Sequence, residues 1–150
     1  MGQSLVKNYI HITFGTKHRE PMIYPPYEQA LHAYLGELCN DMDCPVLVVG
    51  GYTDHIHILC LLSKNISLVE LVKKIKGRSS IWMKEQGNHL CNFYWQDGYG
   101  AFSVNPADIE KVKNYILNQH KHHEKKGFVE EYRGFLNKYN VDFNEDYLWD

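Results

Sequence analysis

The sequence lacks any apolar run that approaches the roughly 18 residues of a transmembrane helix. Its start alternates apolar and polar residues and has no compact apolar stretch followed by a small-residue cleavage site, so no targeting segment is expected. The four cysteines form no Cys-x-x-Cys pair, which argues against both a disulfide framework and a cysteine-based zinc site. We therefore expect a reduced cytoplasmic protein that does not enter a membrane.

Motifs of several enzyme classes are also missing. The chain has no glycine-rich phosphate loop of the Walker or dinucleotide type and no His-Glu-x-x-His zinc motif. The pair Gly50–Gly51 fits neither loop and is interpreted as a strand end or a β-bulge. These absences argue against nucleotide-binding enzymes and zinc proteases of the common kinds.

The composition is that of one ordinary globular domain, assigned to residues 1–150. Apolar residues make up 44% of the 150 residues, aromatic residues 13% and charged residues 23%. The net charge of −2 exerts no overall attraction for nucleic acid, yet residues 65–107 and 108–129 each carry +2 while residues 130–150 carry −4. Basic segments next to an acidic tail permit a phosphate-binding face without requiring one.

The hydrophobic periodicity predicts an α+β fold. Alternating residues indicate strands, helical spacing and capping residues indicate helices, and the C-terminal residues 128–149 are expected to hold one or two helical turns and a tail. The resulting order is that of a ferredoxin-like (RRM-like) antiparallel sheet with helices on one face. An extra C-terminal helix carries Tyr115 and must pack on a sheet edge or on the open face. The expected strands are 5–14, 45–52, 55–62 and 101–104, and the expected helices are 25–40, one from 67 and 107–125.

Two histidines on one predicted strand are the first candidate site. Side chains alternate along a strand, so His55 and His57 share one face and could bind a metal ion through ring nitrogens. The alternative is a pair of surface histidines on a half-exposed strand. His11 lies in a similar Ile-His-Ile context on the first strand, where packing or hydrogen bonding is favoured over ligation.

A tyrosine and a glutamine on the predicted helix 107–125 are the second candidate. Tyr115 and Gln119 are one helical turn apart, beside the apolar stripe that packs on the sheet. A tyrosine acts as a nucleophile only if its proton is removed, and an amide oxygen is a fair ligand for Mg²⁺ or Mn²⁺. For an isolated tyrosine, packing of the ring on the sheet is the favoured interpretation.

Two basic segments could contact a phosphate backbone. The first follows the first strand and contains Lys17 and Arg19, and the second lies on the helix from residue 67 and contains Lys76 and Arg78. Solvated surface is an equally good interpretation of both segments.

Taken in order, these features resemble the single-tyrosine HUH transposases of the insertion-sequence 200/605 type. The His55-Ile56-His57 strand and the Tyr115/Gln119 helix carry the resemblance. Each motif alone is weak, but the set follows the family's order over nearly the whole chain. The further segments that agree are 16–19, 76–80, 95–99, 102–104 and 147–149.

The resemblance implies both a mechanism and partners. His55, His57 and Gln119 would bind one Mg²⁺ or Mn²⁺ ion, and Tyr115 would attack a phosphate of single-stranded DNA to form a 5′-phosphotyrosine link. A second DNA end would then resolve the link, so that DNA transposition needs no ATP. Members of this family are homodimers that recognise hairpins at the ends of the element, and the tyrosine helix can serve the histidines of the other subunit.

Other functions on the same fold stay open. One is a non-catalytic or domesticated module that binds DNA or RNA hairpins, because open four-stranded sheets with aromatic residues stack bases. A rolling-circle initiator or relaxase-like nickase would share the histidine pair. A metallohydrolase would need a base near the metal, for which the sequence offers only Asp54.

Overall fold

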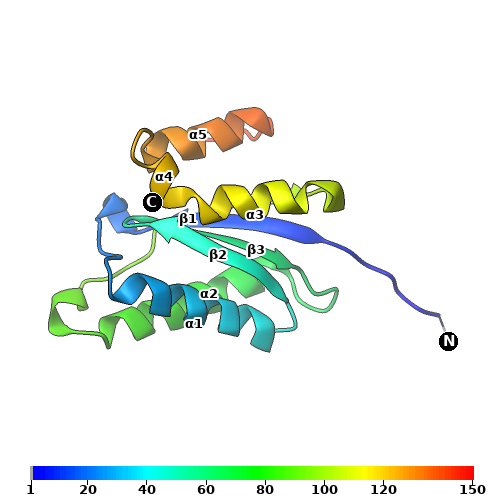
Figure 1. Ribbon diagram of the computed structural model, residues 1–150, viewed down its shortest axis with the longest axis horizontal. Coiled ribbons are helices and arrows are strands. Elements are labelled where there is room, and N and C mark those ends of the chain that lie inside the picture. Colours follow the sequence, from blue (N-terminus) through cyan, green and yellow to red (C-terminus); the bar gives the residue numbers. More distant parts are fainter. Residues whose placement is uncertain (1) are drawn as a thin grey trace.

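The computed structural model describes residues 2–150 and consists of one four-stranded antiparallel sheet with helices on both faces (Figure 1). The strands lie side by side in the order β2-β3-β1-β4, which confirms the predicted α+β fold. No helix within residues 2–150 combines the length and the apolar character needed to span a membrane. The strands are β1 (Tyr9–Gly15), β2 (Val46–Tyr52), β3 (His55–Leu61) and β4 (Gly100–Val104), and the helices are α1 (Tyr27–Asp41), α2 (Leu68–Lys84), α3 (Ile109–Leu117), α4 (Gln119–His122) and α5 (Phe128–Lys138), with short 3₁₀ turns at Lys17–Arg19, Asn88–Leu90 and Pro106–Asp108.

The two faces of the sheet carry different layers. Helices α1 and α2 cover one face, whereas α3, α4 and α5 lie on the other (Figure 1). Strand alternation sends the apolar side chains toward α1 and α2, where they form the main core. Fully buried members of that core include Ile12, Phe14, Ile56, Ile58, Leu31, Leu35, Leu71 and Ile75.

A smaller apolar cluster holds α5 against the sheet. Phe128, Tyr132 and Leu136 recur at helical spacing along α5 and pack with Phe102 of β4. Because this cluster anchors α5, the polar groups between α5 and the sheet are enclosed by protein. The extra C-terminal helical structure thus packs on the open face of the sheet, which is one of the two positions that the sequence predicted.

The predicted single helix over residues 107–125 is wrong. It consists of a 3₁₀ turn, α3 and α4, with a break at Asn118. The Asn118 side-chain amide donates to the Asn114 carbonyl oxygen at 2.8 Å, the kind of local bond by which asparagine competes with helical geometry. The C-terminal helix was also underestimated, because α5 spans 11 residues rather than one or two turns.

The first strand begins later than predicted. Residues 5–8 alternate as a strand would, yet β1 starts at Tyr9 because Tyr9 is already paired with Leu61 and Val104, where its two neighbouring strands end. Without a partner strand, the preceding residues have no ladder to join.

Gly50 lies inside β2 rather than at a strand end or bulge, and the register irregularity falls between Val46 and Val48. A methyl group on Gly50 would lie 2.5 Å from the carbonyl oxygen of Ile116 in α3. The glycine therefore permits α3 to lie directly on the sheet. Gly50 also pairs with His57, so this contact sets the distance between α3 and the histidine strand.

We expect Gly50→Ala to lower the free energy of unfolding by about 1–3 kcal/mol, because α3 must move away from the sheet to relieve the overlap. Urea unfolding of the purified variant measures this. Gly77→Ala in α2 is the matched control, since a methyl group there meets nothing within 4 Å and alanine favours a helix. Equal stability of the Gly50→Ala variant and the parent would contradict the argument.

Candidate functional site

His55 and His57 lie on the face of β3 that α3, α4 and α5 cover, and both are completely buried. The alternation of the strand therefore holds as predicted. The alternative of surface histidines on a half-exposed strand is wrong, because the C-terminal helices enclose this face.

A hydrogen bond at Nδ1 fixes the orientation of each ring. His55 Nδ1–H donates to Asp54 Oδ1 at 2.7 Å, and His57 Nδ1 lies 2.8 Å from Nε2 of His11. Burial, together with His57, lowers the pKa of His11 to about 3, so His11 is neutral and can either donate or accept. The predicted hydrogen-bonding role of His11 is confirmed, and both Nε2 atoms remain available on the opposite side of their rings.

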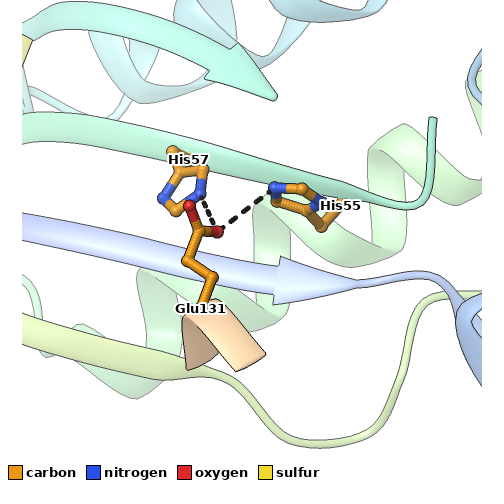
Figure 2. A group of neighbouring side chains, drawn as sticks. All are labelled: His55, His57 and Glu131. Carbon is orange, nitrogen blue, oxygen red and sulfur yellow. Dashed lines mark hydrogen bonds and ion pairs between the residues drawn. The ribbon is translucent and has the colours of Figure 1, made fainter. Parts of the chain in front are cut away.

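Glu131 of α5 completes the group from the far side of the layer. Its Oε1 lies 2.9 Å from His57 Nε2 and 3.4 Å from His55 Nε2 (Figure 2). Burial raises the pKa of Glu131, but hydrogen bonds from His123, His55 and His57 outweigh it and hold the pKa far below its usual value. Glu131 is therefore an ionised carboxylate in an enclosed site.

Gln119 and His123 of the α4 turn form the next side of the site. Gln119 Oε1 lies 2.9 Å from both His55 Nε2 and His123 Nε2. The amide nitrogen of Gln119 donates to Glu131 Oε2 at 3.1 Å, and His123 Nε2 lies 3.3 Å from the same oxygen. Gln119 is the first residue of α4 and His123 follows one turn later at its C-terminal end. Both side chains therefore reach Oε2 of Glu131.

The Tyr115 hydroxyl donates to Oε2 of Glu131, the carboxylate whose other oxygen faces the histidines. The Tyr115 ring stacks on His122 with centroids 4.9 Å apart and meets His57 edge-on at 6.0 Å. Burial and the negative charge of Glu131 raise the pKa of Tyr115 above its usual value. The phenol is thus protonated and held against a charged acceptor.

These residues offer a fitting set of donors for a divalent cation. Ligand atoms of His55, His57 and Glu131 all lie within 4.8 Å of one another, and Gln119 Oε1 is in contact with His55. Two imidazole nitrogens with carboxylate and amide oxygens suit Mn²⁺, and the oxygen ligands also suit Mg²⁺. The hydrogen bonds at Nδ1 supply the outer contacts that metal-binding histidines usually have.

A proton occupies part of this site when no metal is bound. Burial lowers the pKa of His55, but hydrogen bonds to Asp54 and Glu131 outweigh it and raise the pKa to about 9. A metal ion at Nε2 must displace that proton, so affinity should rise as the pH approaches 9 and level off above it.

We expect the apparent Kd for Mn²⁺ to fall by about tenfold per pH unit between pH 6.5 and 8.0. Isothermal titration calorimetry at three pH values measures the slope. Asp54→Asn removes a carboxylate that raises the pKa of His55. In this variant the increase in Mn²⁺ affinity with pH should therefore occur at lower pH. A Kd that is independent of pH in the parent protein would contradict this proton competition.

The sequence-predicted basic residues lie apart from this group, and Lys76 already has acceptors. Its ammonium donates to the carbonyl oxygens of Gln96, Asp97 and Gly98 at 2.6, 2.9 and 2.8 Å. Burial lowers the pKa of Lys76 to about 8. This lysine ties α2 to the loop before β4, and a DNA contact there stays a prediction.

The other three basic residues are at the surface. Lys17 lies 3.7 Å from a carboxylate oxygen of Asp97, and the Arg19 guanidinium lies 5.0 Å from the ring centre of Trp149. Arg78 lines a shallow depression on α2 together with neighbouring lysines. Their predicted contacts with DNA also stay predictions.

Two residues of this site, Glu131 and His123, were not predicted from the sequence. Glu131 could have been suspected, because it interrupts the apolar stripe of α5, three residues after Phe128 and four before Phe135. A carboxylate in such a stripe must find a buried partner. His123 follows Gln119 by one helical turn, but the uninterrupted helix that the sequence predicts places His122 on the Tyr115 stripe instead.

The chain matches the family model for IS200-like transposases over residues 4–119. It is 29% identical over 114 residues to the transposase for insertion sequence element IS200 of Salmonella typhimurium, covering 73% of this chain and 74% of the relative. The IS200 transposase of Salmonella typhi gives the same figures.

Two solved structures share the fold. One is a transposase-like protein from Deinococcus radiodurans, with a TM-score of 0.62, 20% identity and coverage of 79% of this chain and 96% of that one. The other is a REP-associated tyrosine transposase bound to a REP hairpin, with a TM-score of 0.60, 16% identity and coverage of 82% and 73%. At these identities the likeness supports the fold, while the family match rests on the sequence.

Proposed function

The chain belongs to the IS200-like transposase family, and from this premise we propose that it cleaves and rejoins single-stranded DNA at the ends of an insertion sequence. The cleavage would proceed through a 5′-phosphotyrosine intermediate on Tyr115. One observation carries the proposal: the Tyr115 hydroxyl and the Nε2 of His57 contact the two oxygens of one buried carboxylate, Glu131. The nucleophile is thus one side chain away from the metal-binding nitrogens.

His55, His57, Glu131 and Gln119 would hold Mn²⁺ or Mg²⁺. When bound, the ion supplies a positive charge that polarises the scissile phosphate. The protein's own residues supply the rest. Nδ1 contacts to Asp54 and His11 hold the two rings in place, and the burial of both rings keeps bulk water away from their Nε2 atoms.

In the cleavage step the Tyr115 oxygen forms a bond to phosphorus while the bond from phosphorus to the 3′ oxygen breaks. Glu131 Oε2, which already accepts the Tyr115 hydrogen bond, takes the phenol proton and passes it to the leaving 3′ oxygen, which becomes a hydroxyl. In the joining step the oxygen of a second 3′ hydroxyl bonds to phosphorus while the bond from phosphorus to the Tyr115 oxygen breaks. Glu131 takes the proton of the attacking hydroxyl and returns it to Tyr115. One phosphodiester replaces another, so no external energy source is needed.

We further propose that the DNA ends carry hairpins and that the protein works as a homodimer, as the family resemblance implies. The related REP-associated transposase was solved bound to a hairpin, which supports the first point. The outer edges of β2 and β4 have no strand partner within residues 2–150, which leaves two edges for pairing of subunits. We also propose that residues 1–150 form one domain, because α5 lies beyond the family match and still packs on the same sheet.

The direct test mixes the protein with Mn²⁺ and single-stranded hairpin oligonucleotides that carry varied flanks. We expect a protein–DNA band that survives a denaturing gel and disappears when EDTA is present. Tandem mass spectrometry of the band should place the nucleotide on Tyr115. Hairpin binding without any covalent band, also with hairpins taken from the flanking genomic DNA, would overturn the proposal and favour a non-catalytic hairpin-binding module.

A further inference from the structure

A cavity of about 440 Å³ opens beside Tyr115 on the side away from α4, between α3, α5 and the end of β4. Its size falls within the range of about 300–1,000 Å³ that is typical of small-ligand sites. Tyr115 forms part of its wall, so a ligand in this cavity would lie next to the attacking side chain. The metal-binding group uses none of its other lining residues except His11, which supports His57 from behind. We call it the α3–α5 cavity.

Aromatic rings line the α5 side of this cavity. Phe135 and Tyr139 belong to its wall, and both stack on Phe102 with nearly parallel planes. The ring centres lie 5.5 Å apart for Phe135 and Phe102 and 4.9 Å apart for Tyr139 and Phe102. Tyr139 remains 42% exposed. A flat base could extend this array.

Cations complete the lining. Lys111 comes from α3 and Lys138 from α5, on two different elements of the wall, and Asp108 is the acidic residue among the lining side chains. Neither lysine belongs to any salt bridge that the described residues form, although the Lys138 ammonium lies 5.4 Å from the centre of the Tyr139 ring. Exposed aromatic faces with lysines close by are the arrangement by which proteins bind single-stranded nucleic acid.

We propose that the α3–α5 cavity binds one unpaired nucleotide of the DNA, next to the phosphate that Tyr115 attacks. The base packs against Phe135 and Tyr139, and Lys111 and Lys138 neutralise its phosphate. This inference rests on the proposed function for the position of that phosphate. It adds where this nucleotide lies and which side chains contact its base and its phosphate.

The test uses Tyr115→Phe protein, which cannot form the covalent link, and a single-stranded oligothymidylate of ten nucleotides that contains 5-iododeoxyuridine. Irradiation joins this base to a stacked aromatic ring, and mass spectrometry identifies the residue. We expect the cross-link within residues 135–139 and its absence when the oligonucleotide is annealed to its complement. Cross-links confined to other parts of the chain would overturn the proposal.

Affinity measured by fluorescence anisotropy with the same oligonucleotide provides the second readout. Tyr139→Ala should weaken binding about tenfold and Tyr139→Phe should restore it, because stacking needs the ring and not the hydroxyl. Because Tyr139 also packs on Phe102, two exposed lysines are changed separately, and neither change removes a ring of the array. Lys111→Gln and Lys138→Gln should each weaken binding several-fold. Tyr24→Ala and Lys64→Gln are the matched controls, because both residues are exposed and neither lines the cavity. Parent-like affinity in all three cavity variants would contradict the proposal.

The two proposals fail separately. A wild-type protein that forms no phosphotyrosine while the cross-link maps to residues 135–139 would contradict the cleavage reaction and leave the nucleotide site standing. A phosphotyrosine on Tyr115 with cross-links elsewhere would contradict the nucleotide site alone.

Discussion

Tyr115→Phe should abolish the covalent protein–DNA product, with a loss of more than about 10³-fold in strand cleavage. The substitution removes one oxygen, and that oxygen is the atom that would bond to phosphorus. The ring contacts with His122 and Phe135 need no hydroxyl, so the fold should be unchanged. The Kd values for hairpins and for Mn²⁺ should change by no more than about twofold. Cleavage would be measured on a denaturing gel with end-labelled DNA.

Tyr132→Phe is the matched control for this prediction. Tyr132 is another buried tyrosine of the same layer, and it packs on Phe128 and Trp149 rather than on the histidines. It should cleave at the parent rate. Cleavage by Tyr115→Phe at a rate comparable with that of the control would show that water or another side chain is the nucleophile, and the proposed reaction would be wrong.

Glu131→Gln should weaken Mn²⁺ binding by about 100-fold or more. The amide keeps nearly the same shape, but it removes the negative charge that faces His55 and His57 across 3.4 and 2.9 Å. The same change removes the acceptor for the Tyr115 proton, so cleavage should fall further than the loss of metal alone explains. Calorimetry with Mn²⁺ and cleavage assays at saturating Mn²⁺ separate the two effects.

Glu130→Gln serves as the control because Glu130 is the preceding residue of the same helix and is exposed to solvent. It should bind Mn²⁺ as the parent does. If Glu131→Gln also keeps parent affinity, the carboxylate is not a metal ligand. Its role would then be confined to holding Tyr115 and the protonated His55 in the metal-free protein.

The position of Glu131 also bears on how the site is built. The family match ends at residue 119, at Gln119, whereas Glu131 lies 12 residues beyond it in α5. In this chain a segment outside the matched region closes the histidine face and supplies a carboxylate to it. The same segment carries Phe135 and Tyr139, so it lines the proposed nucleotide site as well as the proposed metal site.

The sequence by itself determined the sheet, the helical layer on one face and half of the site, because these depend on local periodicity. Two-residue alternation places His55 and His57 on one face whatever surrounds the strand. Helical spacing predicts that Tyr115 and Gln119 lie close together, one turn apart. They remain close despite the break at Asn118, since both side chains contact Glu131. The order of elements was sufficient to predict the sheet, since short connections and antiparallel pairing leave few arrangements.

Only the tertiary structure decided which groups meet across the layer. Glu131 lies 74 residues from His57, and no spacing rule links a strand to a helix that packs on it from the far end of the chain. His55 and His57 are buried only because α5 packs over the face of the sheet to which their strand, β3, directs them. The raised pKa of His55 depends on the same packing, because Glu131 of α5 contacts its ring. Lys76 likewise has the sequence features of a phosphate contact, yet three carbonyl oxygens of a distant loop surround it. Periodicity specifies which side of an element a residue occupies, whereas its partner and its charge state follow from long-range packing and desolvation.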